Sequence, residues 1–462
     1  AFSGGVDIQS AGPSLVFNVM TDIFDRLTGG RIIGACFFLA ILFAVISSLF
    51  SFFEIAIRTF EDHCHMGRRN ATILTAVIIG AGNIIGVGVA IAAGGPGAVF
   101  WCWLTGVLGM ATRYSEGLLA IKYRVENKDG NMSGGPMFVL ERGLNSKWLG
   151  AAFAVFTAIA AFGIGNLTQG NAAAEQLHHA FSIPSWGTAA VLTALTALVM
   201  LGGIQGIARV CAFFVPFMAV IYIMGCLYIL TVQAEYIIPA IRYILDCAFT
   251  GEAAAGGAAG AAVMAAMRTG VARGLFSNEA GLGSAAIASA AAQNRNPVRQ
   301  ALISSSGPFW DTVIICALTG IVLTTSIIAH PDISCTDGPK LTTLAFSKIP
   351  YIGSPLLTLS LVTFVVSTIL GWSYFGEKAL EYLGGIRLIM PYRVIWVAAV
   401  FIGCVSKIEL VWIFADCANG LMALPNLISL LALSGVLVQQ TRYYLWQHRL
   451  DDYDESHIPE GK

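Results

Sequence analysis

Two stretches of the chain place amide and carboxylate side chains among closely spaced glycines. The first, GAGNIIGVG, runs from Gly80 to Gly88, and the second, GLFSNEAGLGS, runs from Gly274 to Ser284. Each glycine inside a helix costs about 1 kcal/mol relative to alanine, so both stretches are expected to interrupt a helix. Unwound turns expose amides that can hold a carboxylate and carbonyl oxygens that can hold a monovalent cation. This chemistry fits an amphoteric ligand, such as an amino acid, together with a coupling ion.

The glycines alone also fit a second interpretation, which is close packing of helices through small residues. Asn83, Asn278 and Glu279 favour the first interpretation, because packing requires neither a carboxamide nor a carboxylate inside a bilayer. An interrupted helix at membrane depth is tolerated only where it is buried or lines a cavity. We therefore predict that the two interruptions form a ligand site.

The elements that must position these residues are membrane-spanning helices. Of the 462 residues, 56% are hydrophobic and only 11% are charged, against roughly 25% charged in soluble domains. The mean hydropathy of +0.74 agrees. A net charge of −1 leaves no basic field for nucleic acid, and ten cysteines are too few for a secreted disulfide scaffold. The composition predicts an all-α polytopic membrane protein.

Eleven apolar runs are long enough to cross about 30 Å of hydrocarbon. They lie at 32–57, 72–94, 98–121, 150–170, 187–206, 210–232, 260–292, 302–328, 355–376, 391–406 and 411–438. A short amphipathic segment at 13–29 precedes them and is expected to lie along the membrane interface.

The loops on one side of these spans hold 17 of the 26 Lys and Arg residues. Cytoplasmic loops carry the excess of positive charge in membrane proteins. We therefore expect the amino terminus outside and the carboxyl terminus in the cytoplasm.

The two interruptions fall in the second and seventh spans, which are five spans apart. An odd offset inverts one group of five spans relative to the other, and paired interruptions in two halves point to a transporter site. The predicted organisation has five parts. They are an extracytoplasmic interfacial segment (1–30), an extra first span (31–58), a first five-helix repeat (70–232), a second, inverted repeat (256–438) and a cytoplasmic tail (439–462).

Five stretches resemble the alanine/glycine:cation symporter family. They are GAGNIIGVGVAIAAGGPGAVFWCWLTGVLGMATRYSEGLLAIKYR (80–124), NMSGGPMFVLERGL (131–144), GNLTQGNA (165–172), RGLFSNEAGLGSA (273–285) and STILGWSYFGEKALEYLGG (367–385). The resemblance covers most of the chain. It implies the leucine-transporter-type fold of amino acid-polyamine-cation transporters, with five-plus-five inverted repeats. It also implies sodium-coupled import of alanine, glycine or D-alanine across a bacterial plasma (inner) membrane.

The resemblance further implies roles for individual residues. Gly82 and Asn83 match the contacts to the substrate carboxylate and to the ion at the first interruption. Gln169 matches a polar contact to the substrate, and Trp372 resembles a bulky wall that keeps the pocket small. The second interruption contributes Phe276, Ser277, Asn278 and Glu279.

The fold, rather than a family motif, implies a sodium site. It would be formed by the carbonyls of Ala76 and Ile79 and by the hydroxyls of Ser367 and Thr368. Relatives usually carry threonine where this chain has Ala81 and Val89. The loss of two hydroxyls leaves the substrate preference and the ion stoichiometry open.

Several polar residues admit two interpretations. Asp311 lies inside the eighth span, so it must be hydrogen-bonded or hold an ion. Arg113 and Glu116 are expected to form a local ion pair, and Arg273 could serve an outer gate or a helix end. The run from Asp62 to His65 lacks a partner pair of ligands, so we do not expect a metal there.

Other function classes have less support in the sequence. A channel would need a repeated filter loop or a ring of pore charges, and a membrane enzyme would need a cluster of catalytic side chains. The nucleotide motif G-x-x-x-x-G-K-[ST] does not occur. We expect a secondary transporter rather than an enzyme. Sodium and a small neutral amino acid are its expected partners, with no organic cofactor and no ATP. Proton coupling is the alternative.

Overall fold

The computed structural model describes residues 81–127, 132–201, 219–250, 259–292, 295–336, 338–406, 408–452 and 458. Within these ranges the chain is mainly helical, and one antiparallel hairpin pairs β1 (Val125–Glu126) with β2 (Met132–Ser133). The expected interfacial segment, the extra first span, the Asp62–His65 run and two proposed sodium ligands, Ala76 and Ile79, lie outside the described residues.

Five described helices are long and apolar enough to cross a membrane, as predicted for the corresponding runs. They are Lys147–Phe181, Pro297–Ala329, Gly353–Gly384, Ile386–Val405 and Ile413–Ala432. A sixth candidate consists of Ala219–Val232 and Ala234–Phe249, which meet at 86°. The shorter apolar helices Ile85–Gly94 and Ser185–Met200 also fall in predicted spans. The chain is therefore a multi-pass membrane protein.

The second predicted interruption is present, and the described part of the first, from Ala81 onward, is not regular α-helix until Ile85. The first is a single 3-10 turn, η1 (Ala81–Asn83), which is followed after Ile84 by helix α4 (Ile85–Gly94). The second separates α12 (Ala259–Asn278) from α13 (Ser284–Ala290). Three of its five residues, Glu279, Gly281 and Gly283, have positive φ angles, so the chain cannot continue as a helix there.

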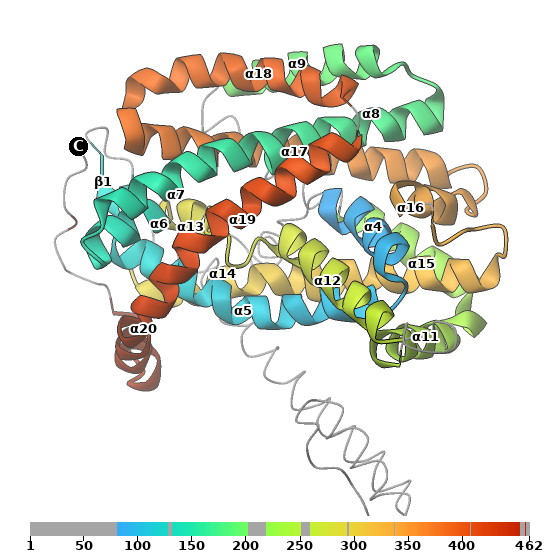
Figure 1. Ribbon diagram of the computed structural model, residues 1–462, viewed down its shortest axis with the longest axis horizontal. Helices are drawn as coiled ribbons and strands as arrows, with labels where there is room; N and C mark the ends of the chain where they lie inside the picture. The colour runs from blue at the N-terminus through green and yellow to red at the C-terminus, as the bar shows by residue number, and fades with distance from the viewer. Residues whose placement is uncertain are drawn as a thin grey trace, which may run out of the picture.

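The helices form two packed groups (Figure 1). In the first group, α5 (Ala98–Lys122) packs against α12 and α14 (Pro297–Pro308), and α12 also packs against α4. The second group contains α7 (Lys147–Ala160), α8 (Thr168–Phe181), α9 (Ser185–Leu201), α17 (Gly353–Gly384) and α18 (Ile389–Val405). Each group combines helices from the first and second halves of the chain. Helix α17 contacts both interruptions through η1 and α13.

The remaining elements complete the described chain. They are α6 (Pro136–Phe138), η2 (Val139–Gly143), η4 (Ala234–Tyr236), α11 (Ile237–Phe249), α15 (Ala317–Ala329), α16 (Gly338–Ser347), η6 (Ile386–Leu388), α19 (Ile408–Ala432), α20 (Ser434–Thr441) and η7 (Arg442–Trp446).

Two long helices contain π-helical segments that the sequence pattern does not predict. The segment η3 (Ala161–Leu167) joins α7 to α8, and η5 (Phe309–Cys316) joins α14 to α15. The π-helical turn is rare in proteins, and the examples that occur are often found at functional sites. Both segments directly precede or contain residues of the candidate site.

Two predicted boundaries are corrected. Helix α17 continues to Gly384, eight residues past the expected end at 376, because its charged last turns are bound by neighbouring elements. The last span ends at Ala432, and the chain then continues as α20 and η7 to Trp446. The tail predicted to start at 439 therefore begins inside a helix. The buried ring of Tyr444 and hydrogen bonds from Asn296 to three backbone carbonyls beyond it hold this end in place.

Candidate functional site

The two interruptions meet at the carboxylate of Asp311, which lies on η5. Asn83 Nδ2 donates a hydrogen bond to Asp311 Oδ1 at 2.6 Å. Ser277 Oγ lies 2.7 Å from Asp311 Oδ2 and 2.5 Å from Asn83 Oδ1, so its hydroxyl can donate to either oxygen. Thr312 Oγ1 donates to Asp311 Oδ2 at 2.9 Å. We call these four residues the Asp311 cluster.

The Asp311 cluster holds a carboxylate without a basic partner. Asn83 is fully buried and Asp311 is 2% exposed, and no ion pair of the described residues includes Asp311. A buried charge needs a compensating charge or hydrogen bonds. The side-chain atoms that meet there are mainly carboxylate, carboxamide and hydroxyl oxygens, which are the ligand atoms that a hard cation prefers. These oxygen atoms have the chemistry of ligands for a hard cation.

The second interruption is held by a carboxylate from α5. Glu116 Oε1 accepts hydrogen bonds from the backbone amides of Gly281 and Gly283, each at 3.0 Å, and from Asn426 Nδ2 at 2.7 Å. Asn426 Nδ2 also lies 2.9 Å from the Gly281 carbonyl. These contacts satisfy the backbone groups that the unwound turn exposes.

The expected ion pair between Arg113 and Glu116 is not formed. No ion pair within the described ranges joins them, because the carboxylate is directed at the amides of the second interruption instead. The i, i+3 spacing of Arg113 and Glu116 had suggested a partner on the same helix. Asn426, which completes this arrangement, carries no sequence signal of its own.

Gln169 and Asn278 differ in the hydrogen-bonding capacity left to a ligand. Gln169 Nε2 donates to the Ile164 carbonyl at 2.9 Å, while its buried Oε1 has no hydrogen-bond partner. This oxygen can accept a hydrogen bond from an ammonium group. Asn278 Oδ1 accepts from the Ala280 amide at 3.0 Å, and its Nδ2 lies 3.4 Å from Thr105 Oγ1. Both ends of Asn278 are therefore used within the protein.

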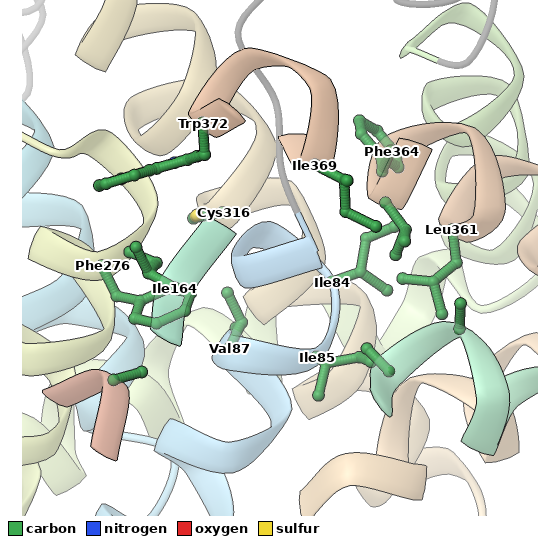
Figure 2. Close-up of a cluster of buried hydrophobic side chains, with 14 of the residues drawn as sticks. Ile84, Ile85, Val87, Ile164, Phe276, Cys316, Leu361, Phe364, Ile369 and Trp372 are labelled. Carbon is green, nitrogen blue, oxygen red and sulfur yellow. The ribbon is translucent and has the colours of Figure 1, made fainter. Parts of the chain in front are cut away.

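Apolar side chains from three elements surround these polar groups. Figure 2 shows Trp372, Phe276 and Ile164 extending from α17, α12 and η3 into one region of buried side chains. Trp372 is 2% exposed and Phe276 is 6% exposed. A Cβ atom at Gly82 would lie 3.0 Å from the ring of Phe276, so the backbone of the first interruption lies directly against this ring. The structure thus brings the predicted residues of both interruptions close together.

The described half of the proposed sodium site lies on α17. Ser367 and Thr368 each donate to the Phe364 carbonyl at 2.9 Å. Helix α17 contacts η1 of the first interruption. The two hydroxyls therefore belong to a helix that packs against the interruption whose carbonyls were predicted to complete the sodium site.

A basic residue of α12, Arg273, lies six residues before the start of the second interruption at Glu279. Arg273 forms an ion pair with Asp416 of α19, and its guanidinium lies 5.5 Å from the ring centroid of Phe276. These contacts connect the aromatic side chain of the site with the neighbouring helix α19.

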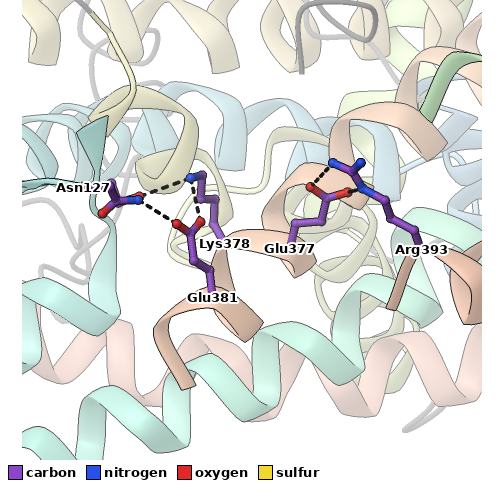
Figure 3. Close-up of polar contacts among 6 residues, drawn as sticks. Asn127, Glu377, Lys378, Glu381 and Arg393 are labelled. Atoms are coloured by element: carbon purple, nitrogen blue, oxygen red, sulfur yellow. Dashed lines mark hydrogen bonds and ion pairs between the residues drawn. The ribbon is translucent and has the colours of Figure 1, made fainter. Parts of the chain in front are cut away.

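A charged cluster lies at the far end of α17 (Figure 3). Glu381 binds Lys378 at 2.7 Å and accepts from Asn127 Nδ2 at 2.6 Å, while Arg393 of α18 binds Glu377 at 2.6 Å. A cavity of about 270 Å³ borders these side chains. Here each carboxylate has a basic partner, unlike Asp311. Within the described ranges, no group of three His, Cys, Asp or Glu residues could hold a metal ion.

Comparison with known proteins identifies the family of the chain. The model of the sodium:alanine symporter family matches residues 21–458. An uncharacterized transporter of Haemophilus influenzae is 47% identical over 83% of this chain and 84% of its own length. The sodium/alanine symporter AgcS of Methanococcus maripaludis is 45% identical over 80% of this chain and 82% of its own.

The fold resembles that of a solved transporter. The crystal structure of MhsT in complex with L-phenylalanine matches with a TM-score of 0.53 and 15% identity, over 77% of this chain and 87% of that chain. This likeness concerns the fold alone. The family match establishes that the protein is a transmembrane amino-acid symporter and not an enzyme. The chain belongs to the sodium:alanine symporter family.

Proposed function

We propose that the protein imports a small neutral amino acid, with alanine and glycine as the main candidates and D-alanine as a third, together with sodium. The observation that carries this proposal is the meeting of both interruptions at Asp311. A cation bound there would offset the buried carboxylate and would contact residues of both interruptions at once. Its binding would therefore organise the turns that also hold the amino acid.

The substrate would lie between the two interruptions. Gly82 and Asn83 would face its carboxylate, and the free Oε1 of Gln169 would accept from its ammonium group. Phe276, Ser277 and Asn278 would line the pocket, and Trp372 would limit its size. A second ion would use the hydroxyls of Ser367 and Thr368, which the fold pairs with the carbonyls of Ala76 and Ile79.

The proposed architecture follows the family and the distribution of charge. It has eleven spans in two inverted five-helix repeats, an outer amino terminus and an inner carboxyl terminus. The charged cluster around Lys378 and Arg393 would then lie on the cytoplasmic side, where basic residues accumulate. Cysteine labelling at Cys335, which is exposed between α15 and α16, should come from the outer side of intact cells.

Uptake by purified protein in liposomes tests the proposed coupling. A tenfold sodium gradient supplies about 1.4 kcal/mol, and 100 mV supplies about 2.3 kcal/mol per charge. Together, about 3.7 kcal/mol per sodium ion supports roughly 500-fold accumulation of alanine. Uptake that runs equally well on a proton gradient without sodium would contradict sodium coupling and support the proton-coupled alternative.

A further inference from the structure

Glu279 connects the second interruption to helix α17. Its Oε1 accepts a hydrogen bond from the indole Nε1 of Trp372 at 2.9 Å, and its Oε2 accepts one from Ser284 Oγ at 2.7 Å. Ser284 is the first residue of α13. Each carboxylate oxygen is therefore engaged by a neutral donor of the protein, and the direction of the carboxylate is determined by the start of α13.

The backbone of Glu279 also restricts this carboxylate. Glu279 has a φ angle of +54°, a left-handed conformation that residues other than glycine seldom adopt. Such outliers persist where the surrounding structure holds them, and they concentrate at functional sites. The side chain of Glu279 consequently leaves the chain in a direction that a helical residue at this position could not reach.

The indole of Trp372 is confined on its other sides by packing. A Cβ atom at Gly165 would lie 2.1 Å from Trp372 Cβ, so only glycine lets α17 approach η3 this closely. The ring of Phe375 meets the indole edge to face at 5.4 Å. Packing locates the ring, whereas the hydrogen bond to Glu279 sets the orientation of its N–H edge.

We propose that Glu279 is a positioning residue that orients the indole of Trp372 and thereby sets the upper size limit of the transported amino acid. This inference rests on the proposed function, in which Trp372 forms the wall of the pocket. Glu279 acts through the indole and does not bind the substrate ammonium group itself. The hydrogen bond joins Glu279 of the second interruption to Trp372 of α17. A change in the conformation of the second interruption would therefore also change the orientation of the indole.

The proposal and a direct contact to the ammonium group predict different results. The ammonium group is common to all amino acids. If Glu279 contacted it directly, the loss of this contact would weaken the binding of alanine and of valine by the same factor. Loss of an indole support enlarges the pocket and favours larger side chains. Each additional buried carbon of the substrate side chain changes affinity about fourfold. Valine has two more side-chain carbons than alanine, so its affinity should rise about 15-fold relative to that of alanine when the indole no longer limits the pocket.

The experiment measures competition by unlabelled alanine and valine against labelled alanine in purified protein. Glu279→Ala is expected to shift the alanine-to-valine ratio of inhibition constants by about 15-fold towards valine. Glu279→Gln keeps an acceptor for the indole N–H and should stay within about threefold of wild type. Glu381→Ala removes a carboxylate at the far end of α17 and serves as the matched control, with an unchanged ratio.

A double-mutant cycle shows whether Glu279 acts through the indole. Trp372→Phe removes the N–H donor, so adding Glu279→Ala to it should change the ratio by less than about twofold. An additional shift as large as that in the wild-type background would overturn the proposal. If Glu279→Ala does not yield folded protein, Ser284→Ala releases the other oxygen of Glu279 and should shift the ratio in the same direction. An unchanged ratio in Ser284→Ala would then overturn the proposal.

The outcome for the wild-type protein separates this proposal from the one on which it rests. Wild-type protein that shows no sodium-dependent alanine binding would overturn the proposed function. Wild-type binding together with an unchanged ratio in Glu279→Ala, or an equal loss of affinity for alanine and valine, would overturn only the role of Glu279.

Discussion

The two interruptions are built from similar sequences, but their exposed backbone groups have different partners. At the second interruption, the carboxylate of Glu116 already binds the amides of Gly281 and Gly283. At the first, the amino end of α4 has neither a side-chain cap nor an acidic residue in its first turn. A carboxylate of the protein thus binds the backbone amides of the second interruption, whereas at the first interruption Asp311 binds the side chain of Asn83. This contrast supports placing the substrate carboxylate at the first.

The same contrast separates structural from functional polar groups. Residues around the second interruption use their hydrogen bonds within the protein, as Asn278 and Asn426 do. Asp311 on η5 and Gln169 on α8 leave capacity for a ligand, since Asp311 lacks a basic partner in the described structure and the Oε1 of Gln169 has no hydrogen-bond partner. Substitution of Glu116, Asn426 or Gly283 at the second interruption should therefore lower stability, whereas substitution of Asn83 or Gln169 should lower the affinity for the substrate.

The largest effect is expected for Glu116→Ala. It leaves two backbone amides without their acceptor and removes one of the two acceptors of Asn426 Nδ2, and each unsatisfied buried group costs about 1–3 kcal/mol. We expect a loss of at least about 3 kcal/mol in the free energy of unfolding, seen as a lower melting temperature in detergent. Glu116→Gln retains one acceptor oxygen and should lose less. Equal melting temperatures for Glu116→Ala and wild type would remove the proposed difference between the interruptions.

A smaller loss of stability is expected for Gly283→Ala. Its φ angle is +82° and the new methyl group would lie 2.5 Å from Pro136 Cγ. The left-handed conformation costs about 1–2 kcal/mol and the overlap adds about 1–3 kcal/mol. Gly281→Ala is the matched control, because its φ angle is +89° but its nearest atom would be 3.6 Å away. If the two variants melt at the same temperature, the contact with Pro136 does not contribute to the loss of stability.

A loss of affinity for the substrate is expected when Asn83 or Gln169 is replaced. Asn83→Ala and Gln169→Ala each remove a buried polar partner of a charged ligand, which corresponds to about 1.5–3 kcal/mol of binding free energy. Alanine binding to purified protein should weaken about 10- to 150-fold, while the protein remains folded. Asn426→Ala, a carboxamide of the second interruption, should instead melt earlier and keep its affinity for alanine. Wild-type affinity in Asn83→Ala would exclude this residue from the site.

The smallest change in stability is expected for Gly82→Ala. The new methyl group would lie 3.0 and 3.3 Å from two ring atoms of Phe276, and this ring can shift at its flexible end. We expect less than about 1 kcal/mol of destabilisation. Measured beside Gly283→Ala in the same detergent, this variant compares one glycine from each interruption. A loss as large as that of Gly283→Ala would mean that both interruptions are equally rigid.

Local features of the sequence were sufficient to predict much of the architecture. The apolar runs predicted the long spans, since crossing a bilayer requires a minimum length of apolar helix. Clusters of glycine with Asn83 and Asn278 predicted both interruptions, because the conformational cost of glycine acts at each position on its own. Asp311 was recognised as a residue that must have hydrogen-bond partners or hold an ion.

Only the tertiary structure decided which partners the buried polar groups have. Asn83 and Asp311 are 228 residues apart, and Glu279 and Trp372 are 93 apart, so no local spacing connects them. The π-helical segments and the capping of Gly283 by Glu116 likewise depend on how separate helices pack. Buried polar groups take the donors and acceptors that neighbouring helices bring within reach, because leaving them unpaired is costly. The sequence by itself therefore determined where the helices are interrupted. Packing between the helices decided at which interruption a carboxylate of the protein binds the exposed backbone amides.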